Sequence, residues 1–194
     1  MTNPSVRRIL VLAAAATAIL ISGTSTAGAA ADDPEETGTA EGPGLTTYTY
    51  DQFQNKRSGK CLQVDNRSRN AGAWVVQRTC TTGESKRWQQ WRIIDLENGY
   101  VLLQARHSDD MCLEVNQAGG SNGKSNNARL LQWNCHRGAQ QQWDKTELDA
   151  GFLKNRRSNR CVEPDQRAGK GRAEGGPVLQ WTCHRGPHQR WEER

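Results

Sequence analysis

The sequence contains six cysteines and four histidines, and these residue types form either disulfides or metal sites. The cysteines fall as three pairs whose partners are 19, 23 and 22 residues apart. No Cys-x-x-Cys pair occurs, and the histidines do not stand at zinc-ligand spacings: His107, His136, His184 and His188. We therefore predict no metal site and three disulfides: Cys61–Cys80, Cys112–Cys135 and Cys161–Cys183.

The cysteine pairs belong to an internal repeat. Residues 131–138 match residues 179–186 almost letter for letter, and residues 54–62 resemble residues 154–162. Each copy then ends on a Gln-x-Trp motif, and a third such motif stands at 89–91. Three units of about 50 residues follow, near 46–94, 95–146 and 147–194, and triplication without capping units suggests closed three-fold symmetry.

The N-terminal segment predicts export. Arg7 and Arg8 precede an apolar run at 9–21, and small residues follow at 23–31. This is the plan of a secretory signal peptide, and the run is too short to span the ~30 Å hydrocarbon core of a membrane. We expect a signal peptide over 1–30, a disordered acidic leader over 31–45 and one domain over 46–194, in a secreted protein without a membrane span.

The charge of the chain is mildly basic, with 26 Lys and Arg against 21 Asp and Glu. Binding to nucleic acid requires these charges to gather on one face with exposed aromatic residues between them. Here the basic residues scatter through all three repeats. We therefore expect no nucleic-acid partner.

Short runs of β-type composition stand at 100–103, 112–115 and 129–133, and turn-rich stretches separate them. No window of about 12 or more residues after the signal peptide shows a helical stripe. The sequence therefore predicts an all-β fold. Three repeats, each with a cysteine pair and a terminal Gln-x-Trp, resemble the ricin-type β-trefoil lectin domain over 46–194. That resemblance implies twelve strands in a six-stranded barrel capped by three hairpins, with one potential sugar pocket per repeat.

The resemblance also implies which residues contact a sugar. In that family an acidic residue lies two positions after the first cysteine, an aromatic residue lies two positions before the second, and an Asn-Gln pair precedes the final x-Trp. A flat aromatic face stacks on a sugar ring, and a carboxylate accepts hydrogen bonds from adjacent hydroxyls. The matching residues are Glu114, Trp133, Gln140 and Gln141 in the second repeat, and Glu163, Trp181, His188 and Gln189 in the third.

The first repeat departs from this pattern. Gln63 stands in the acidic position, Arg78 in the aromatic position and Trp88 in the Asn position. We expect its pocket to be lost or to serve another role. In the other two repeats the acid is Glu and not the usual Asp, which leaves open whether the pocket accepts a sugar and which one.

Several of these residues have a structural alternative. Glu114 and Glu163 either face a polar pocket or pair with a basic residue, because an unpaired buried carboxylate is costly. Trp133 and Trp181 either present a stacking face or are packed. The motif glutamines either bond the backbone or contact the sugar. The motif tryptophans are expected in the core: Trp91, Trp143 and Trp191.

Two function classes remain. The first is a non-catalytic, monomeric lectin-like protein that binds a glycan or polysaccharide without a cofactor. The second is a β-trefoil that binds or inhibits a protein and whose sugar sites have decayed. An enzyme is disfavoured because Glu114 and Glu163 belong to separate repeats and so cannot share one glycosidic bond, and because no hydrolase or phosphate-binding motif occurs. A Glu114 that converges with Trp133 on an open pocket favours the lectin, whereas a Glu114–Arg pair beside a packed Trp133 favours the alternative.

Overall fold

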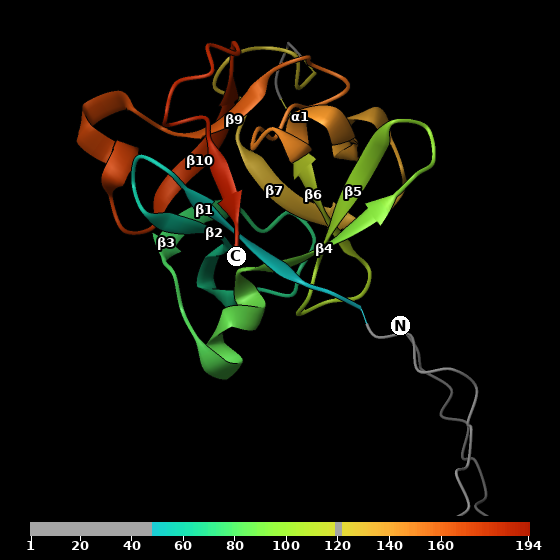
Figure 1. Ribbon diagram of the computed structural model, residues 1–194, viewed down its shortest axis with the longest axis horizontal. Helices are drawn as coiled ribbons and strands as arrows, with labels where there is room; N and C mark the ends of the chain where they lie inside the picture. Colours follow the sequence, from blue (N-terminus) through green and yellow to red (C-terminus); the bar gives the residue numbers. More distant parts are fainter. Residues whose placement is uncertain (1–47, 119–121) are drawn as a thin grey trace, which may run out of the picture. The chain divides into compact units, whose positions relative to one another are not determined.

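The computed structural model describes residues 48–118 and 122–194, so the expected signal peptide and leader lie outside the described residues. The described part is an all-β domain built on an 11-stranded antiparallel sheet (Figure 1). Its strands are β1 (Asp51–Asn55), β2 (Lys60–Val64), β3 (Val75–Thr79), β4 (Gln90–Asp95), β5 (Tyr100–Ala105), β6 (Met111–Val115), β7 (Leu130–Asn134), β8 (Trp143–Asp144), β9 (Cys161–Pro164), β10 (Gly176–Trp181) and β11 (Trp191–Glu193). No helix among the described residues is long and apolar enough to cross a bilayer.

The sheet follows the order β7-β6-β5-β4-β1-β2-β3-β10-β9, with β11 on β1 and β8 on β5. The pairs β2–β3, β6–β7 and β9–β10 form one hairpin in each repeat, and Figure 1 shows β9 beside β10. The three hairpins also touch one another, through the β3–β10 pairing and through isolated bridges from Trp74 to Leu131 and from Arg129 to Leu179. The arrangement closes on itself, as three-fold symmetry requires.

The third repeat has one regular strand fewer than the other two in the described structure. Where its first strand is expected, residues 152–155 make only isolated bridges, to Arg190, Cys161 and Trp143. A short helix, α1 (Lys145–Asp149), precedes this segment, and the Asp144 side chain caps it by accepting from the Glu147 backbone N–H. Short 3₁₀ turns lie at Asp65–Arg67 (η1), Gly83–Trp88 (η2), Ala139–Gln141 (η3) and Arg167–Arg172 (η4).

The motif tryptophans lie in the core, at 0–2% exposure. Each indole N–H donates to the carbonyl of the residue that follows the first cysteine of its repeat, over 3.0–3.4 Å: Trp91 to Leu62, Trp143 to Leu113 and Trp191 to Val162. The same bond therefore ties the end of each repeat to its second strand. A buried indole keeps a hydrogen-bond partner in this way.

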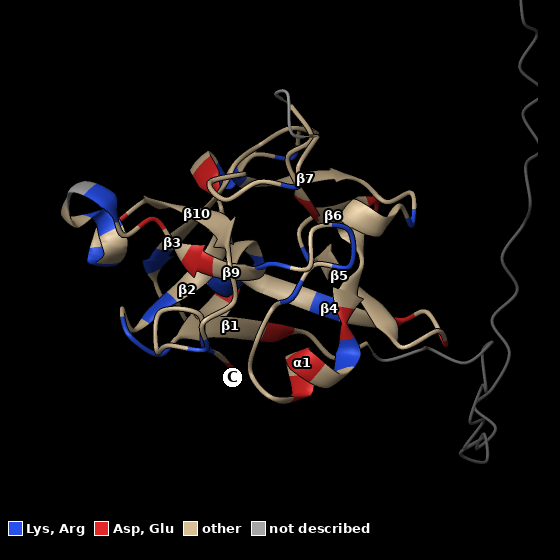
Figure 2. Ribbon diagram, turned by 90° about the horizontal axis from the view of Figure 1, so that it is seen from above, with Lys and Arg blue, Asp and Glu red and all other residues tan. Residues whose placement is uncertain are grey.

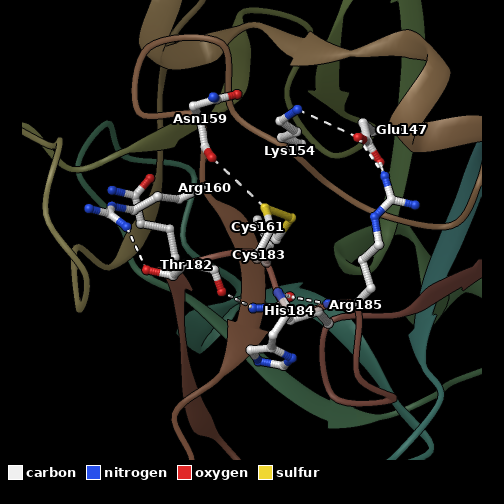
Figure 3. Close-up of a disulfide and its surroundings, with 12 residues drawn as sticks. Glu147, Lys154, Asn159, Arg160, Cys161, Thr182, Cys183, His184 and Arg185 are labelled. Atoms are coloured by element: carbon white, nitrogen blue, oxygen red, sulfur yellow. Dashed lines mark hydrogen bonds and ion pairs between the residues drawn. A yellow bond between two sulfur atoms is a disulfide. The ribbon is translucent and has the colours of Figure 1, made fainter.

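All three predicted disulfides are confirmed, each with its Cα atoms 5.0 Å apart. Each bridge joins the first strand of a hairpin to a cysteine one or two residues past the end of the second strand, so the open end of the hairpin is held together. Figure 3 shows Cys161 and Cys183 with His184 directly beside the bridge. The bridge thus positions the segment that follows the second cysteine.

A second set of repeated glutamines fastens the long loops. Gln77, Gln132 and Gln180 stand just before the aromatic position of each repeat and are fully buried. Each side-chain NH₂ donates to two backbone carbonyls of the loop from the preceding repeat, in cyclic order: Gln132 to Ser68 and Asn70, Gln180 to Gly123 and Ser125, and Gln77 to Lys170 and Ala173. Each hairpin is therefore bordered by the loop of the repeat before it.

Candidate functional site

The two candidate stacking residues lie on the outer ends of hairpins. Trp133, in β7, is 43% exposed, which is unusual for so large an apolar side chain. A Cβ atom at Gly72 would lie 3.4 Å from the Trp133 ring, so one edge of the indole packs against the loop of the first repeat. Trp181, at the end of β10, is partly buried. Trp133 therefore offers an accessible aromatic face.

In the second repeat the predicted acid and the motif glutamine form one cluster. Glu114, in β6, is only 5% exposed. Its Oε2 accepts from Gln141 Nε2 over 2.8 Å and lies 3.0 Å from His136 Nε2. Gln141 Nε2 also donates to the Asn134 carbonyl over 2.8 Å, and its Oε1 accepts from the His136 backbone N–H over 2.9 Å. The glutamine thus holds the carboxylate in place, and Glu114 Oε1 has no partner among the described residues.

The third repeat builds the same cluster. Glu163, in β9, accepts at Oε2 from Gln189 Nε2 over 2.8 Å and lies 3.1 Å from His184 Nε2. Gln189 also donates to the Thr182 carbonyl over 3.0 Å and accepts from the His184 backbone N–H over 2.8 Å. Two repeats that are 48 residues apart in sequence therefore reproduce one hydrogen-bond geometry.

The histidine after the second cysteine was not predicted as a site residue. His136 and His184 each accept at Nδ1 from a glycine N–H two residues later, Gly138 over 3.0 Å and Gly186 over 3.1 Å. In a neutral ring this assigns the proton to Nε2, which points at the carboxylate and donates to it. The sequence carried a signal for this role, because His-Arg-Gly follows the cysteine in both repeats, whereas Thr81 takes its place in the first.

The residues in the family's Asn position lie against these histidines. Gln140 Nε2 is 3.4 Å from His136 Nε2, and His188 Nε2 is 2.9 Å from His184 Nε2. Burial lowers the pKa of His188 below its ordinary value, and the nearby Glu163 carboxylate opposes this in part. His188 is therefore a neutral neighbour of the Glu163 cluster at neutral pH.

Folding also brings together three atoms of metal-ligand type. His184 and His188 stand four residues apart, which is a zinc-ligand spacing, contrary to our expectation from the sequence, and Glu163 joins them from β9. One ligand atom each from Glu163, His184 and His188 lies within 4.8 Å of the other two. A metal ion at His184 Nε2 would need the lone pair of that atom, but the bond from Gly186 to Nδ1 assigns a proton to it in the neutral ring. In this geometry the three residues fit a hydrogen-bonded cluster better than a metal centre.

A cavity of about 230 Å³ opens beside the third cluster. Glu163, Trp181, His184 and His188 line it together with residues of the loop after β9 and with Asn127 from the loop of the second repeat. Arg167 in that loop donates to Asp165, and this bond lowers the pKa of the Asp165 carboxyl. Three of the predicted residues therefore line one pocket: Glu163, Trp181 and His188. Gln189 does not line it and instead holds the Glu163 carboxylate by a hydrogen bond.

The first repeat keeps a cavity in the equivalent place, of about 380 Å³. Gln63 and Arg78 line it, as their positions in the repeat predict. Trp88 does not reach it and stacks on His107 at a ring-centroid distance of 4.5 Å. The pocket of the first repeat is thus present, with a polar and basic lining in place of an aromatic one.

Comparison with known proteins agrees with this architecture. The family model of the ricin-type beta-trefoil lectin domain matches residues 49–191. The chain therefore belongs to the ricin-type β-trefoil lectin domain family. A comparison with curated proteins finds no match to the sequence.

Solved structures show the same fold. The designed three-fold symmetric protein ThreeFoil is 32% identical with a TM-score of 0.64, over 74% of this chain and 96% of that one. The exo-beta-1,3-galactanase 1,3Gal43A from Clostridium thermocellum is 24% identical with a TM-score of 0.63, over 76% of this chain and 30% of that one. The C-half of an earthworm R-type lectin, solved in complex with GalNAc, is 12% identical with a TM-score of 0.57, over 75% of this chain and 97% of that one. The predicted all-β trefoil is confirmed. The domains of this family generally bind carbohydrate and are generally non-catalytic.

Proposed function

We propose that this protein is a secreted, non-catalytic, monomeric lectin that binds glycans through two shallow sites, in the second and third repeats. In each site the tryptophan stacks on a sugar ring, Trp133 in one and Trp181 in the other. The free oxygens of Glu114 and Glu163 accept hydrogen bonds from sugar hydroxyls.

The observation that carries the proposal is the state of the two glutamates. A nearly buried carboxylate that pairs with arginine would serve stability alone. Glu114 instead is held at one oxygen by an amide and an imidazole, which leaves its other oxygen without a protein partner. Preorganised acceptors beside an accessible aromatic face are what sugar recognition requires. Together with the 43% exposure of Trp133, this favours the lectin over a protein-binding trefoil with decayed sites.

Export and the non-catalytic assignment have their own support. Three disulfides are typical of an oxidising compartment. Each glutamate is bonded to its own repeat's glutamine and histidine, so neither is paired with a second carboxylate for hydrolysis. Figure 2 shows Lys and Arg on segments throughout the ribbon with Asp and Glu among them, and this spread of charge does not support a nucleic-acid partner.

A glycan array followed by calorimetric titration of the hits tests the proposal. A single shallow site should bind with a dissociation constant on the order of millimolar, about −4 kcal/mol, and a multivalent glycan should bind more tightly. Trp133→Ala and Trp181→Ala should each remove one site from the stoichiometry, and the double variant should bind no neutral glycan.

Tyr48→Ala is the matched control, since Tyr48 is the other exposed large apolar residue in the described structure, at 48%. It should leave binding unchanged. The absence of binding to every glycan, or equal binding by the double variant and the wild type, would contradict the proposal. In that case pull-down of a protein ligand becomes the test of the alternative. Release of reducing sugar from a bound glycan would contradict the non-catalytic assignment.

A further inference from the structure

The first repeat differs from the other two at the acid position, in the atom that is left without a protein partner. In the other repeats a motif glutamine donates to a carboxylate. Here Gln89 Nε2 donates to Gln63 Oε1 over 2.8 Å, in the same geometry. The other terminal atom of Gln63 is therefore Nε2, a hydrogen-bond donor. At the same position Glu114 and Glu163 have a carboxylate oxygen, which accepts. Gln63 Nε2 has no partner among the described residues, and Gln63 lines the cavity.

The aromatic position has changed in the same sense. Arg78 replaces the tryptophan, and its Nη2 lies 3.1 Å from Asp65 Oδ1. In the third repeat the residue equivalent to Asp65 is Asp165, which pairs with Arg167. In the first repeat Asp65 pairs with Arg78 instead of with Arg67, the residue equivalent to Arg167. Arg67 therefore lines the cavity without an ion pair in the described structure.

One acidic residue, Glu174, also lines this cavity, and its contacts show a structural role. Its carboxylate accepts from the Thr79 backbone N–H over 3.1 Å and from Lys60 Nζ over 2.8 Å. In the third repeat the Asn126 side chain, from the loop of the second repeat, accepts the equivalent hydrogen bond from the Thr182 backbone N–H. Glu174 therefore fastens its loop to β3 and pairs mainly with Lys60, at 2.8 Å, and more weakly with Arg78, whose Nη1 is 4.0 Å from Oε1. Three cations, Lys60, Arg67 and Arg78, thus stand against the carboxylates of Glu174 and Asp65, and Figure 2 shows basic residues on both β2 and β3.

We propose that the first repeat holds a third binding site, specific for the anionic group of an acidic sugar such as a uronic acid. Gln63 Nε2 and the Arg78 and Arg67 guanidiniums supply donors and positive charge where the other repeats supply an acceptor and an aromatic face. A planar carboxylate matches the fork of a guanidinium group. This site is independent of the two neutral-sugar sites proposed above.

The test uses the full chain with Trp133→Ala and Trp181→Ala, which removes the proposed neutral-sugar sites. Calorimetric titration compares trigalacturonic acid with its carboxyl-reduced, neutral counterpart. We expect binding of the acid form alone, weakened by added salt. Gln63→Glu should lower the affinity at least tenfold, and Arg67→Ala at least threefold. Gln63→Glu should still fold, because a Glu–Gln pair is what the other two repeats contain.

Arg69→Ala is the matched control, because it removes the same charge from the same loop at a residue that does not line the cavity. It should leave the affinity within twofold. Equal binding of the acid and neutral forms, no binding of either, or binding unchanged by both Gln63→Glu and Arg67→Ala would overturn the proposal. Titration with a sulfated trisaccharide and with sodium acetate shows whether the site recognises a carboxylate and whether that carboxylate must belong to a sugar. Binding of the sulfated sugar alone would overturn the carboxylate assignment, and binding of acetate as tight as the sugar would overturn the sugar assignment.

Discussion

Replacing Gln141 by leucine tests whether the motif glutamine is a structural residue. The side chain is fully buried and makes three hydrogen bonds, to Glu114 Oε2, to the Asn134 carbonyl and from the His136 backbone N–H. Leucine fills a similar volume but satisfies none of these groups. Each neutral bond contributes about 1 kcal/mol and the bond to the ionised carboxylate about 1.5–3 kcal/mol. The free energy of unfolding should therefore fall by about 3.5–5 kcal/mol.

Urea unfolding followed by tryptophan fluorescence measures this loss. Gln140→Leu is the control, since Gln140 is adjacent and its side chain makes only the 3.4 Å contact with His136. Its effect should stay within about 0.5 kcal/mol. A loss below about 1 kcal/mol for Gln141→Leu would refute the reasoning, because the three bonds would then contribute almost nothing and the glutamine would be a ligand contact.

Three further results are expected. The double variant Cys112→Ser, Cys135→Ser, which opens a loop with a sequence separation of 23, should lose roughly 3 kcal/mol in urea unfolding under non-reducing conditions, and an unchanged midpoint would contradict this. Burial lowers the pKa of His107 below its ordinary value of 6.5, so the unfolded chain binds the proton more readily and stability should decline as the pH falls below 6.5. His107→Phe should reduce the dependence of the melting temperature on pH in this range, and an unaltered dependence would count against it. His188, whose pKa burial also lowers, contributes in the same direction. Gln180→Leu should cost about 3 kcal/mol, because it removes the partner of two loop carbonyls and of the Ser158 hydroxyl, and stability equal to the wild type would show that the loop needs no fastening.

The motif residues show which parts of the fold and the candidate site could be predicted from the sequence. Trp143 could be assigned to the core from its type and its place at the end of a repeat, because a large apolar residue gains most free energy by burial. For Gln141 the sequence left two roles open. The structure shows its bonding to a carbonyl, an N–H and a carboxylate, and these partners come from segments up to 27 residues away.

His136 and His184 show what a residue-by-residue comparison omits. They do not stand at a position that the family pattern names, so the resemblance gave them no role. Their imidazoles nevertheless hold the carboxylates of another strand, at 3.0 and 3.1 Å. The proximity of His184 and His188 could be read from their four-residue spacing, whereas Glu163 joins them only because β9 and β10 pair in a hairpin.

By itself the sequence determined the threefold repetition, the all-β class, the cysteine pairing and the two repeats that keep an acid and an aromatic residue. These follow from local patterns, since a repeat, a strand and a disulfide of about 20 residues are each written within one segment. Only the tertiary structure decided which atoms of those residues are held by other parts of the protein and which are left without a protein partner. Each pocket combines one repeat's hairpin with the loop of the repeat before it, as Asn127 does beside Glu163 and Glu174 does beside Gln63. That contact depends on the closure of the three-fold arrangement, which no single repeat encodes.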